Sequence, residues 1–218
     1  MKSRLSPALP PRLAARLYSG LLADALETLA GAAADERLVY WDGPPGAVPY
    51  GVQSRAQVGG DLGTRLGAAF DDLVFAPGDH ALVVHSDVPG LTPAHIEAAY
   101  AVLARNDVVL GPSRDGGYWC AGLTWKDEGI FHGIPWGTSD TLMRTAQRAH
   151  DSNRRVAYAD WLDDLDTPAE LAGLVAMLAA GLPTCGPHTH AVLRDMGLVP
   201  AWSASSRPAG EPSSPSSP

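Results

Sequence analysis

The sequence of 218 residues predicts an α/β fold with a mostly parallel sheet. Short apolar segments alternate with amphipathic segments of helix length, which is the pattern of βαβ units. The segment 81–84 is apolar at every position, which is typical of a strand buried on both faces in the centre of a sheet. Both observations favour helices packed on a largely parallel sheet.

Helix starts are marked by capping residues or by proline. Leu13, Leu17 and Leu21 recur at helical spacing after Pro10 and Pro11. Helices are expected at 12–30, at 61–74 after Asp61, from 93 for about a dozen residues, at 138–149 after Thr138 or Ser139, and at 168–181. Strands are expected at 37–41, 81–84, 107–110, 118–123 and 156–159, with a surface loop at 42–58.

Composition limits the class of protein. The net charge of −8 opposes general nucleic-acid binding, and the apolar runs are too short to span a bilayer. The first residues lack the apolar core of a signal peptide, and two cysteines make no disulfide framework, so we expect a cytoplasmic protein. We expect one domain at 1–202 and a disordered Ser/Pro-rich tail at 203–218.

The segment His85-Ser86-Asp87-Val88-Pro89 follows the most apolar strand and precedes a helix. Ligand sites of open α/β sheets lie at the carboxyl ends of strands, where Asp87 is expected to hold Mg²⁺ or Mn²⁺. A cation there would bridge a diphosphate and stabilise the leaving group. The alternative is that Asp87 only shapes the turn before Pro89.

Two further acidic segments are candidates. Asp115, Gly116 and Gly117 follow a strand and precede an aromatic residue, which suggests backbone close to a ligand, although Asp-Gly is also a plain turn signal. Asp164 and Asp166 lie just before a helix and would complete a metal site. Alternatively, Asp166 or Thr167 caps that helix.

Basic and glycine-rich segments suggest an anion site. Lys2 and Arg4, spaced by one residue on an expected loop, would clamp a diphosphate. The segment 59–63 opens a helix, so Gly60, Asp61 and Arg65 are candidates for contacts to the same ligand. Both segments also occur as ordinary solvated or capping sequences.

Six segments together resemble the selenodomain-associated transferases, a domain family of uncertain function among the GT-A-fold glycosyltransferases. The matching segments are KSRLSPAL at 2–9, GGDLGTRL at 59–66, HSDVPGLT at 85–92, VVLGPSRDGGYWCAGL at 108–123, IPWGTSD at 134–140 and LDDLDTPAEL at 162–171. They cover nearly the whole chain before the tail.

The resemblance implies a three-layer αβα sandwich that binds a nucleotide-diphosphate sugar or a nucleoside triphosphate. By similarity, Lys2 and Arg4 lie in the loop that meets the phosphates, and Asp87 holds the divalent cation. Asp115 and the glycines after it match the acceptor-side turn. Asp164 and Asp166 match a carboxylate pair near the metal.

The chain departs from the family at its beginning. Family members have an apolar strand before the Lys-x-Arg-Leu segment, whereas here Met1 directly precedes Lys2. We therefore expect the first central strand to be missing, through a start set downstream of the true one.

The resemblance predicts transfer of a sugar from a nucleotide-diphosphate sugar to an unknown small-molecule acceptor. In that reaction Asp87 and its cation stabilise the departing diphosphate, and Asp115 orients the acceptor. Two alternatives stay open. One is nucleotidyl transfer to a phosphorylated acceptor, because the KSRL segment also resembles phospholactate guanylyltransferases. The other is a non-catalytic binding remnant without the first strand.

Overall fold

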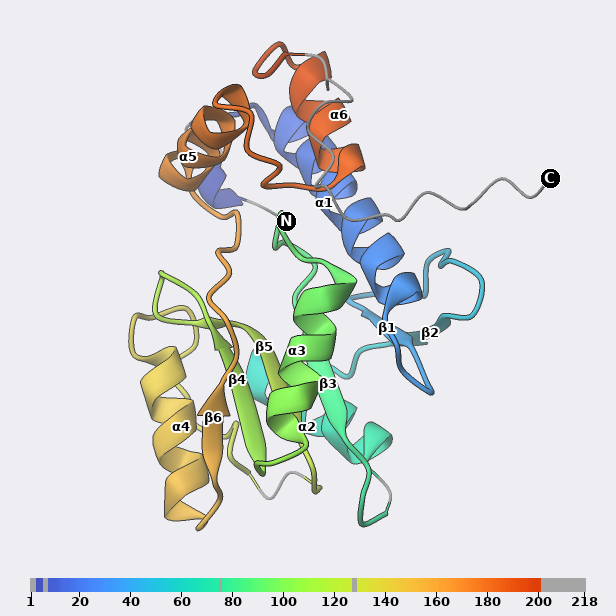
Figure 1. Ribbon diagram of the computed structural model, residues 1–218, viewed down its shortest axis with the longest axis vertical. Helices are drawn as coiled ribbons and strands as arrows, with labels where there is room; N and C mark the ends of the chain where they lie inside the picture. The colour runs from blue at the N-terminus through green and yellow to red at the C-terminus, as the bar shows by residue number, and fades with distance from the viewer. Residues whose placement is uncertain (1–2, 6–7, 75, 127–128, 201–218) are drawn as a thin grey trace, which may run out of the picture.

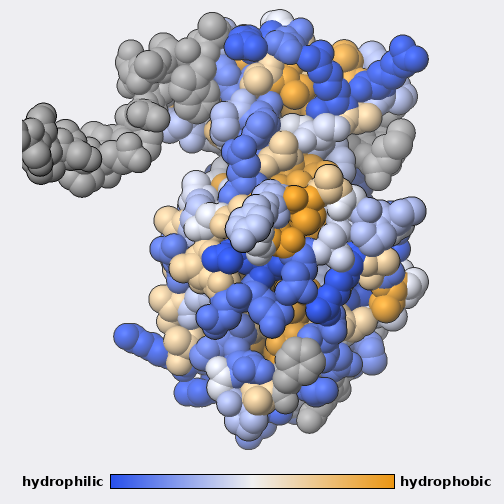
Figure 2. Space-filling model, turned by 90° about the vertical axis from the view of Figure 1, so that its right-hand side faces the viewer, coloured by the Kyte–Doolittle hydropathy of each residue, from blue (hydrophilic) through white to orange (hydrophobic). Residues whose placement is uncertain are grey.

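The computed structural model describes residues 3–5, 8–74, 76–126 and 129–200. Lys2 and the expected tail at 203–218 lie outside these residues. Figure 1 shows an α/β part below and a helical part above. The face in Figure 2 is largely hydrophilic, with hydrophobic residues gathered where the two parts meet. Among the described residues, no helix is long and apolar enough to cross a membrane.

The helices of the α/β part are α2, α3 and α4, and its strands form two sheets. A four-stranded sheet has the order β3-β5-β4-β6, and β1 pairs with β2 in a second sheet. The helices are α2 (Leu62–Leu73), α3 (Pro93–Leu103) and α4 (Thr141–Asp151). The strands are β1 (Leu38–Trp41), β2 (Gln53–Ala56), β3 (Ala81–Val84), β4 (Val108–Pro112), β5 (Tyr118–Leu123) and β6 (Val156–Tyr158).

The expectation of a mostly parallel sheet is met only in part, because the four-stranded sheet is mixed. β5 runs antiparallel to both β3 and β4, and only β4 and β6 are parallel in that sheet. The cause is the short connection 113–117 between β4 and β5, because a parallel pair needs a crossover of a dozen or more residues. β3, expected to be central, pairs with β5 alone and is an edge strand of this sheet among the described residues.

Helices cover both faces of the four-stranded sheet. Leu66 and Phe70 of α2 pack with Ala146 of α4 on one face, in a cluster that includes β4 and β5 residues. Ile96 and Ala99 of α3 pack on the other face. The described residues therefore form α–β–α layers, as the resemblance implied.

The helical part has its own core. It contains η1 (Ser3–Leu5), α1 (Pro11–Gly31), α5 (Pro168–Ala179) and α6 (Pro187–Asp195). Leu5, Leu17, Leu165 and Leu193 are almost completely buried in this cluster. Asp24 of α1 is also buried, and its carboxylate accepts hydrogen bonds from the backbone N–H groups of His188 and Thr189. This contact fixes the N-terminus of α6 against α1.

Three local expectations need correction. β2 lies inside the segment expected to be a surface loop, and α6 was not expected from its polar sequence. α4 begins at Thr141 rather than after Thr138 or Ser139.

The absent first strand stays a prediction. β1 and β3 lie in different sheets, and each has one strand neighbour among the described residues.

Candidate metal centre

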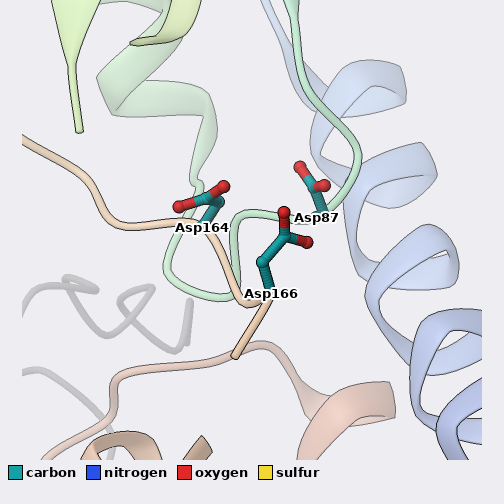
Figure 3. Close-up of side chains that lie close together, drawn as sticks. All are labelled: Asp87, Asp164 and Asp166. Carbon is teal, nitrogen blue, oxygen red and sulfur yellow. The ribbon is translucent and has the colours of Figure 1, made fainter. Parts of the chain in front are cut away.

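Three carboxylates converge at the junction of the two parts (Figure 3). They belong to Asp87, in the loop after β3, and to Asp164 and Asp166, in the segment between β6 and α5. One oxygen from each lies within 4.8 Å of the others. The side chains are neither fully buried nor fully exposed, so a small ligand can reach oxygens that the protein has already brought together. The geometry thus brings together the two segments that the sequence analysis expected to share a metal site.

Backbone hydrogen bonds hold these segments side by side. The N–H of Leu165 donates to the carbonyl oxygen of Asp87 at 3.0 Å, and the N–H of Leu162 donates to Pro112 at 3.2 Å. Leu162 packs against the α3 cluster, whereas Leu165 is buried in the helical core. The chain from Leu162 to Asp166 therefore spans both cores, with its first end bonded to β4 and its second end bonded to the Asp87 loop.

The cap of α5 does not use the side chain of Asp164 or Asp166. Thr167 caps α5 through its side chain, and Glu170 completes the capping box. The Glu170 carboxylate accepts from the N–H groups of Asp166 and Thr167 at 2.6 and 2.8 Å. Thr167 rather than Asp166 is thus the cap, and the Asp166 carboxylate lies beside Asp87 instead.

The electrostatics of the cluster favour a cation. The pKa of Asp164 is raised to about 7, first because burial removes water from the carboxylate and then because Asp115, Asp166, Asp87 and Glu170 add negative charge around it. A divalent cation would relieve this repulsion, and oxygen ligands are those that Mg²⁺ and Mn²⁺ prefer. The residues present therefore fit a hard divalent cation.

Asp115 is held in a fixed conformation next to the cluster. Its Oδ1 accepts from the Ser113 hydroxyl at 2.5 Å and from the N–H of Gly117 at 2.8 Å. The plain turn expected at this place is therefore present, with Asp115 as one of its elements. Its charge is also close enough to raise the pKa of Asp164, so the carboxylate belongs to the electrostatics of the site.

Arg4 brings the one positive charge that the structure records against the cluster within the described residues. Its Nη1 lies 4.0 Å from Oδ2 of Asp166, and its side chain is 63% exposed. Its guanidinium also lies close to Gly137, where an added Cβ would be 3.5 Å from Nη2. An exposed guanidinium at the rim of a carboxylate cluster can bind an anion that the cation also binds.

The other proposed ligand-binding residues have structural partners of their own. Asp61 caps α2 by accepting from the N–H and hydroxyl of Thr64. Arg65 donates to the carbonyl oxygen of Gly60 at 3.2 Å and to Gln57 at 2.9 Å. No contact recorded among the described residues joins them to the three carboxylates. Their role in nucleotide binding stays a prediction.

The loop after β5 is a part of the site that sequence reasoning left without a role. Gly63 of α2 lies directly against the backbone of Phe131, and Gly116 lies directly against Ser139. The ring of Trp136 packs edge-on against that of Tyr118, with a distance of 6.3 Å between the ring centroids. The motif Ile134-Pro135-Trp136-Gly137 was visible in the sequence, but nothing local indicated what it contacts.

An α/β fold with an acidic cluster beyond the ends of its strands is typical of a broad class of ligand-binding proteins. Comparison with known proteins identifies a smaller group within that class. Residues 19–138 match the family described as "Uncharacterized protein conserved in bacteria (DUF2064)". This match covers more than half of the chain, which therefore belongs to the DUF2064 family. No curated protein matches the chain.

A solved structure is similar over most of the chain. It is the crystal structure of a protein from Desulfovibrio desulfuricans G20 named "putative nucleotide-diphospho-sugar transferase". The two share 29% sequence identity with a TM-score of 0.73, over 91% of this chain and 90% of that one. The fold thus resembles that of a protein named for this activity.

Proposed function

We propose that this protein transfers a sugar from a nucleotide-diphosphate sugar to a small-molecule acceptor, in a reaction that needs Mg²⁺ or Mn²⁺. Within the DUF2064 family we assign it to the selenodomain-associated transferases, on the six motifs that span the chain. The observation that carries the proposal is the convergence of Asp87, Asp164 and Asp166 within 4.8 Å.

The three carboxylates would hold the cation, and Arg4 would contact the diphosphate from the same side. When bound, the cation neutralises charge that develops on the departing nucleoside diphosphate. Arg4 already lies 4.0 Å from Asp166, so an anion bound at the cluster would meet its guanidinium. The guanidinium can donate two hydrogen bonds to phosphate oxygens, which orients the donor.

Asp115 would orient the acceptor. The Ser113 hydroxyl and the Gly117 N–H both donate to Oδ1 of Asp115, which fixes the plane of the carboxylate. A carboxylate fixed in this way presents its second oxygen, Oδ2, to an acceptor hydroxyl from a set position. It would hold that hydroxyl for attack on the sugar and take up its proton as the new bond forms.

Further support comes from the Desulfovibrio protein, whose name states this donor class and whose chain matches over most of its length. The two cysteines, Cys120 and Cys185, are buried and free. Free thiols are typical of a reducing compartment, so a cytoplasmic location is part of the proposal.

The decisive experiment follows nucleotide release from a panel of nucleotide-diphosphate sugars, with Mn²⁺ and with EDTA. We expect slow release of nucleoside diphosphate with Mn²⁺ only, reduced about a hundredfold or more by Asp87→Asn. Asp160→Asn is the matched control, because Asp160 is exposed and lies in the same segment as Asp164 but outside the cluster.

Two results would overturn the proposal. One is no release from any donor, and the other is release that Asp87→Asn leaves unchanged. Pyrophosphate release from a nucleoside triphosphate, in the presence of a phosphorylated acceptor, would assign nucleotidyl transfer to the same carboxylates instead.

A further inference from the structure

The described arginines fall into two groups, those that form an ion pair with a carboxylate and those that do not. Most described arginines have a carboxylate within 4.0 Å, namely Arg4, Arg16, Arg55, Arg65, Arg114, Arg155 and Arg194. Arg144 and Arg148 of α4 have no such partner among the described residues, and both are exposed. Arg144 and Arg148 lie one helical turn apart on α4, so two positive charges without an ion-pair partner in the described part of the chain stand side by side in a protein with a net charge of −8.

These two arginines line a cavity of about 380 Å³. One wall is formed by residues 133–135, and the other is α4 with Arg144, Gln147, Arg148 and Asp151. Arg144 and Arg148 are four residues apart, so they lie one above the other on one face of the helix. Gly133 allows a close approach here, because a Cβ at this position would lie 3.1 Å from Nη2 of Arg148.

The side chains that line the cavity carry an excess of positive charge, because two guanidinium groups stand beside one carboxylate. Asp151 is the acidic residue in the lining, and its Oδ1 accepts from the Gln147 amide at 2.8 Å. The structure shows no hydrogen bond or ion pair from the guanidinium of Arg144 or Arg148 to the Asp151 carboxylate. Two like charges one helical turn apart repel each other, and an oxyanion bound between them would remove that repulsion. Each guanidinium can donate two parallel hydrogen bonds to such a ligand.

We propose that this cavity is a second ligand site, which binds the phosphoryl group of a small molecule. It is separate from the carboxylate cluster, because it is lined by α4 and residues 133–135 and contains none of the three aspartates. The same loop continues to Gly137 beside Arg4 and to Ser139 beside Gly116. A phosphoryl group held here would restrain the loop that contacts both of those site residues.

The test is a calorimetric titration of the full chain with inorganic phosphate, without divalent cation and at constant ionic strength. We expect saturable binding that Arg144→Gln and Arg148→Gln each weaken, and that the double variant weakens about tenfold or more. Both side chains are exposed, so these variants should fold, and circular dichroism checks that they do. Arg105→Gln is the control, because Arg105 is exposed and also lacks a recorded carboxylate partner.

A second titration uses a sugar phosphate in place of inorganic phosphate, to separate free phosphate from a phosphorylated ligand. Tighter binding of the sugar phosphate that requires both arginines identifies the organic ligand, whereas equal affinity identifies phosphate itself. The proposal is overturned if phosphate shows no saturable binding, or if the double variant binds as the wild type does. Equal loss in Arg105→Gln would also overturn it. Nucleotide-sugar turnover plays no part in this test, so its result is independent of the proposed function.

Discussion

Gly116 and Ser139 lie in direct backbone contact, which joins the Asp115 turn to the loop before α4. A Cβ added at Gly116 would overlap the carbonyl group of Ser139, and the φ of Gly116 is +87°. The carbonyl oxygen of Gly116 also accepts from the N–H of Leu142 at 2.9 Å. The position of Asp115 thus depends on the residues that begin α4.

Gly116→Ala should destabilise the fold by about 2 kcal/mol or more, because a strained φ and a backbone overlap both have to be relieved. Gly78→Ala is the matched control. Gly78 has a φ of +101° with nothing near its added Cβ, so only the strain remains, at about 1 kcal/mol. Urea unfolding measures both, and equal losses would contradict the close packing at Ser139.

Asp164 should make the stability of the metal-free protein fall as pH rises. Its pKa is about 7 in the folded state and near its ordinary low value in the unfolded chain, so between these values the folded state holds the additional proton. The stabilisation is complete below the unfolded pKa and is lost as pH rises through the folded one. Asp164→Asn should therefore raise Tm at pH 8 and raise it by less at pH 5, where a smaller part of the stabilisation has been lost.

Melting curves in EDTA at the two pH values test this, with Asp160→Asn as the control. A Tm for Asp164→Asn below that of the wild type at pH 8 would argue against charge repulsion in the cluster.

Thr167→Ala should reduce the free energy of unfolding by about 1 kcal/mol, because it removes the side chain that caps α5. Asp166→Asn, measured without metal, should not destabilise the protein in this way, since only the backbone of Asp166 bonds to Glu170. Urea unfolding of the two variants distinguishes a capping residue from a ligand. A larger loss for Asp166→Asn would return Asp166 to a structural role.

Arg4→Gln should weaken the binding of UDP with Mn²⁺ about tenfold, equal to about 1.4 kcal/mol, with a smaller effect on Mn²⁺ alone. The reason is that the guanidinium, 4.0 Å from Asp166, is placed to meet an anion rather than the cation. Arg12→Gln provides the control, as an exposed arginine of α1 with no recorded partner. UDP affinity that does not change in Arg4→Gln would remove Arg4 from the site.

The sequence predicted most helices, because capping residues, prolines and the spacing of apolar residues mark their boundaries locally. Thr92, Thr167 and the prolines after them mark the starts of α3 and α5, and Leu17 and Leu21 mark the buried face of α1. Strand direction is different, since it depends on connection length. The five-residue connection between β4 and β5 was the available signal for antiparallel pairing, and the alternation of strands and helices concealed it.

α6 and β2 could not be predicted in this way, because contacts far along the chain decide them. The start of α6 is fixed by Asp24, more than 160 residues away. β2 has the polar sequence Gln-Ser-Arg-Ala and forms only by pairing with β1.

Of the candidate site, the residue types were predictable but their distances were not. Asp87 and Asp166 were both singled out as oxygen ligands, yet 78 residues of intervening chain separate them. Their meeting requires the hydrogen bond from Leu165 to Asp87, which no local pattern indicates. The choice between Asp166 and Thr167 as the cap was predictable in principle, because Thr167 and Glu170 have the spacing of a capping box.

The claim on which the proposed function depends is that Asp87, Asp164 and Asp166 together bind a divalent cation. Calorimetric titration of the full chain with Mn²⁺ at pH 8 measures this directly, on the wild type, Asp87→Asn and Asp160→Asn. The account predicts one saturable event for the wild type and for Asp160→Asn, and affinity at least about tenfold weaker for Asp87→Asn. No saturable binding, or equal affinity in all three proteins, would contradict it.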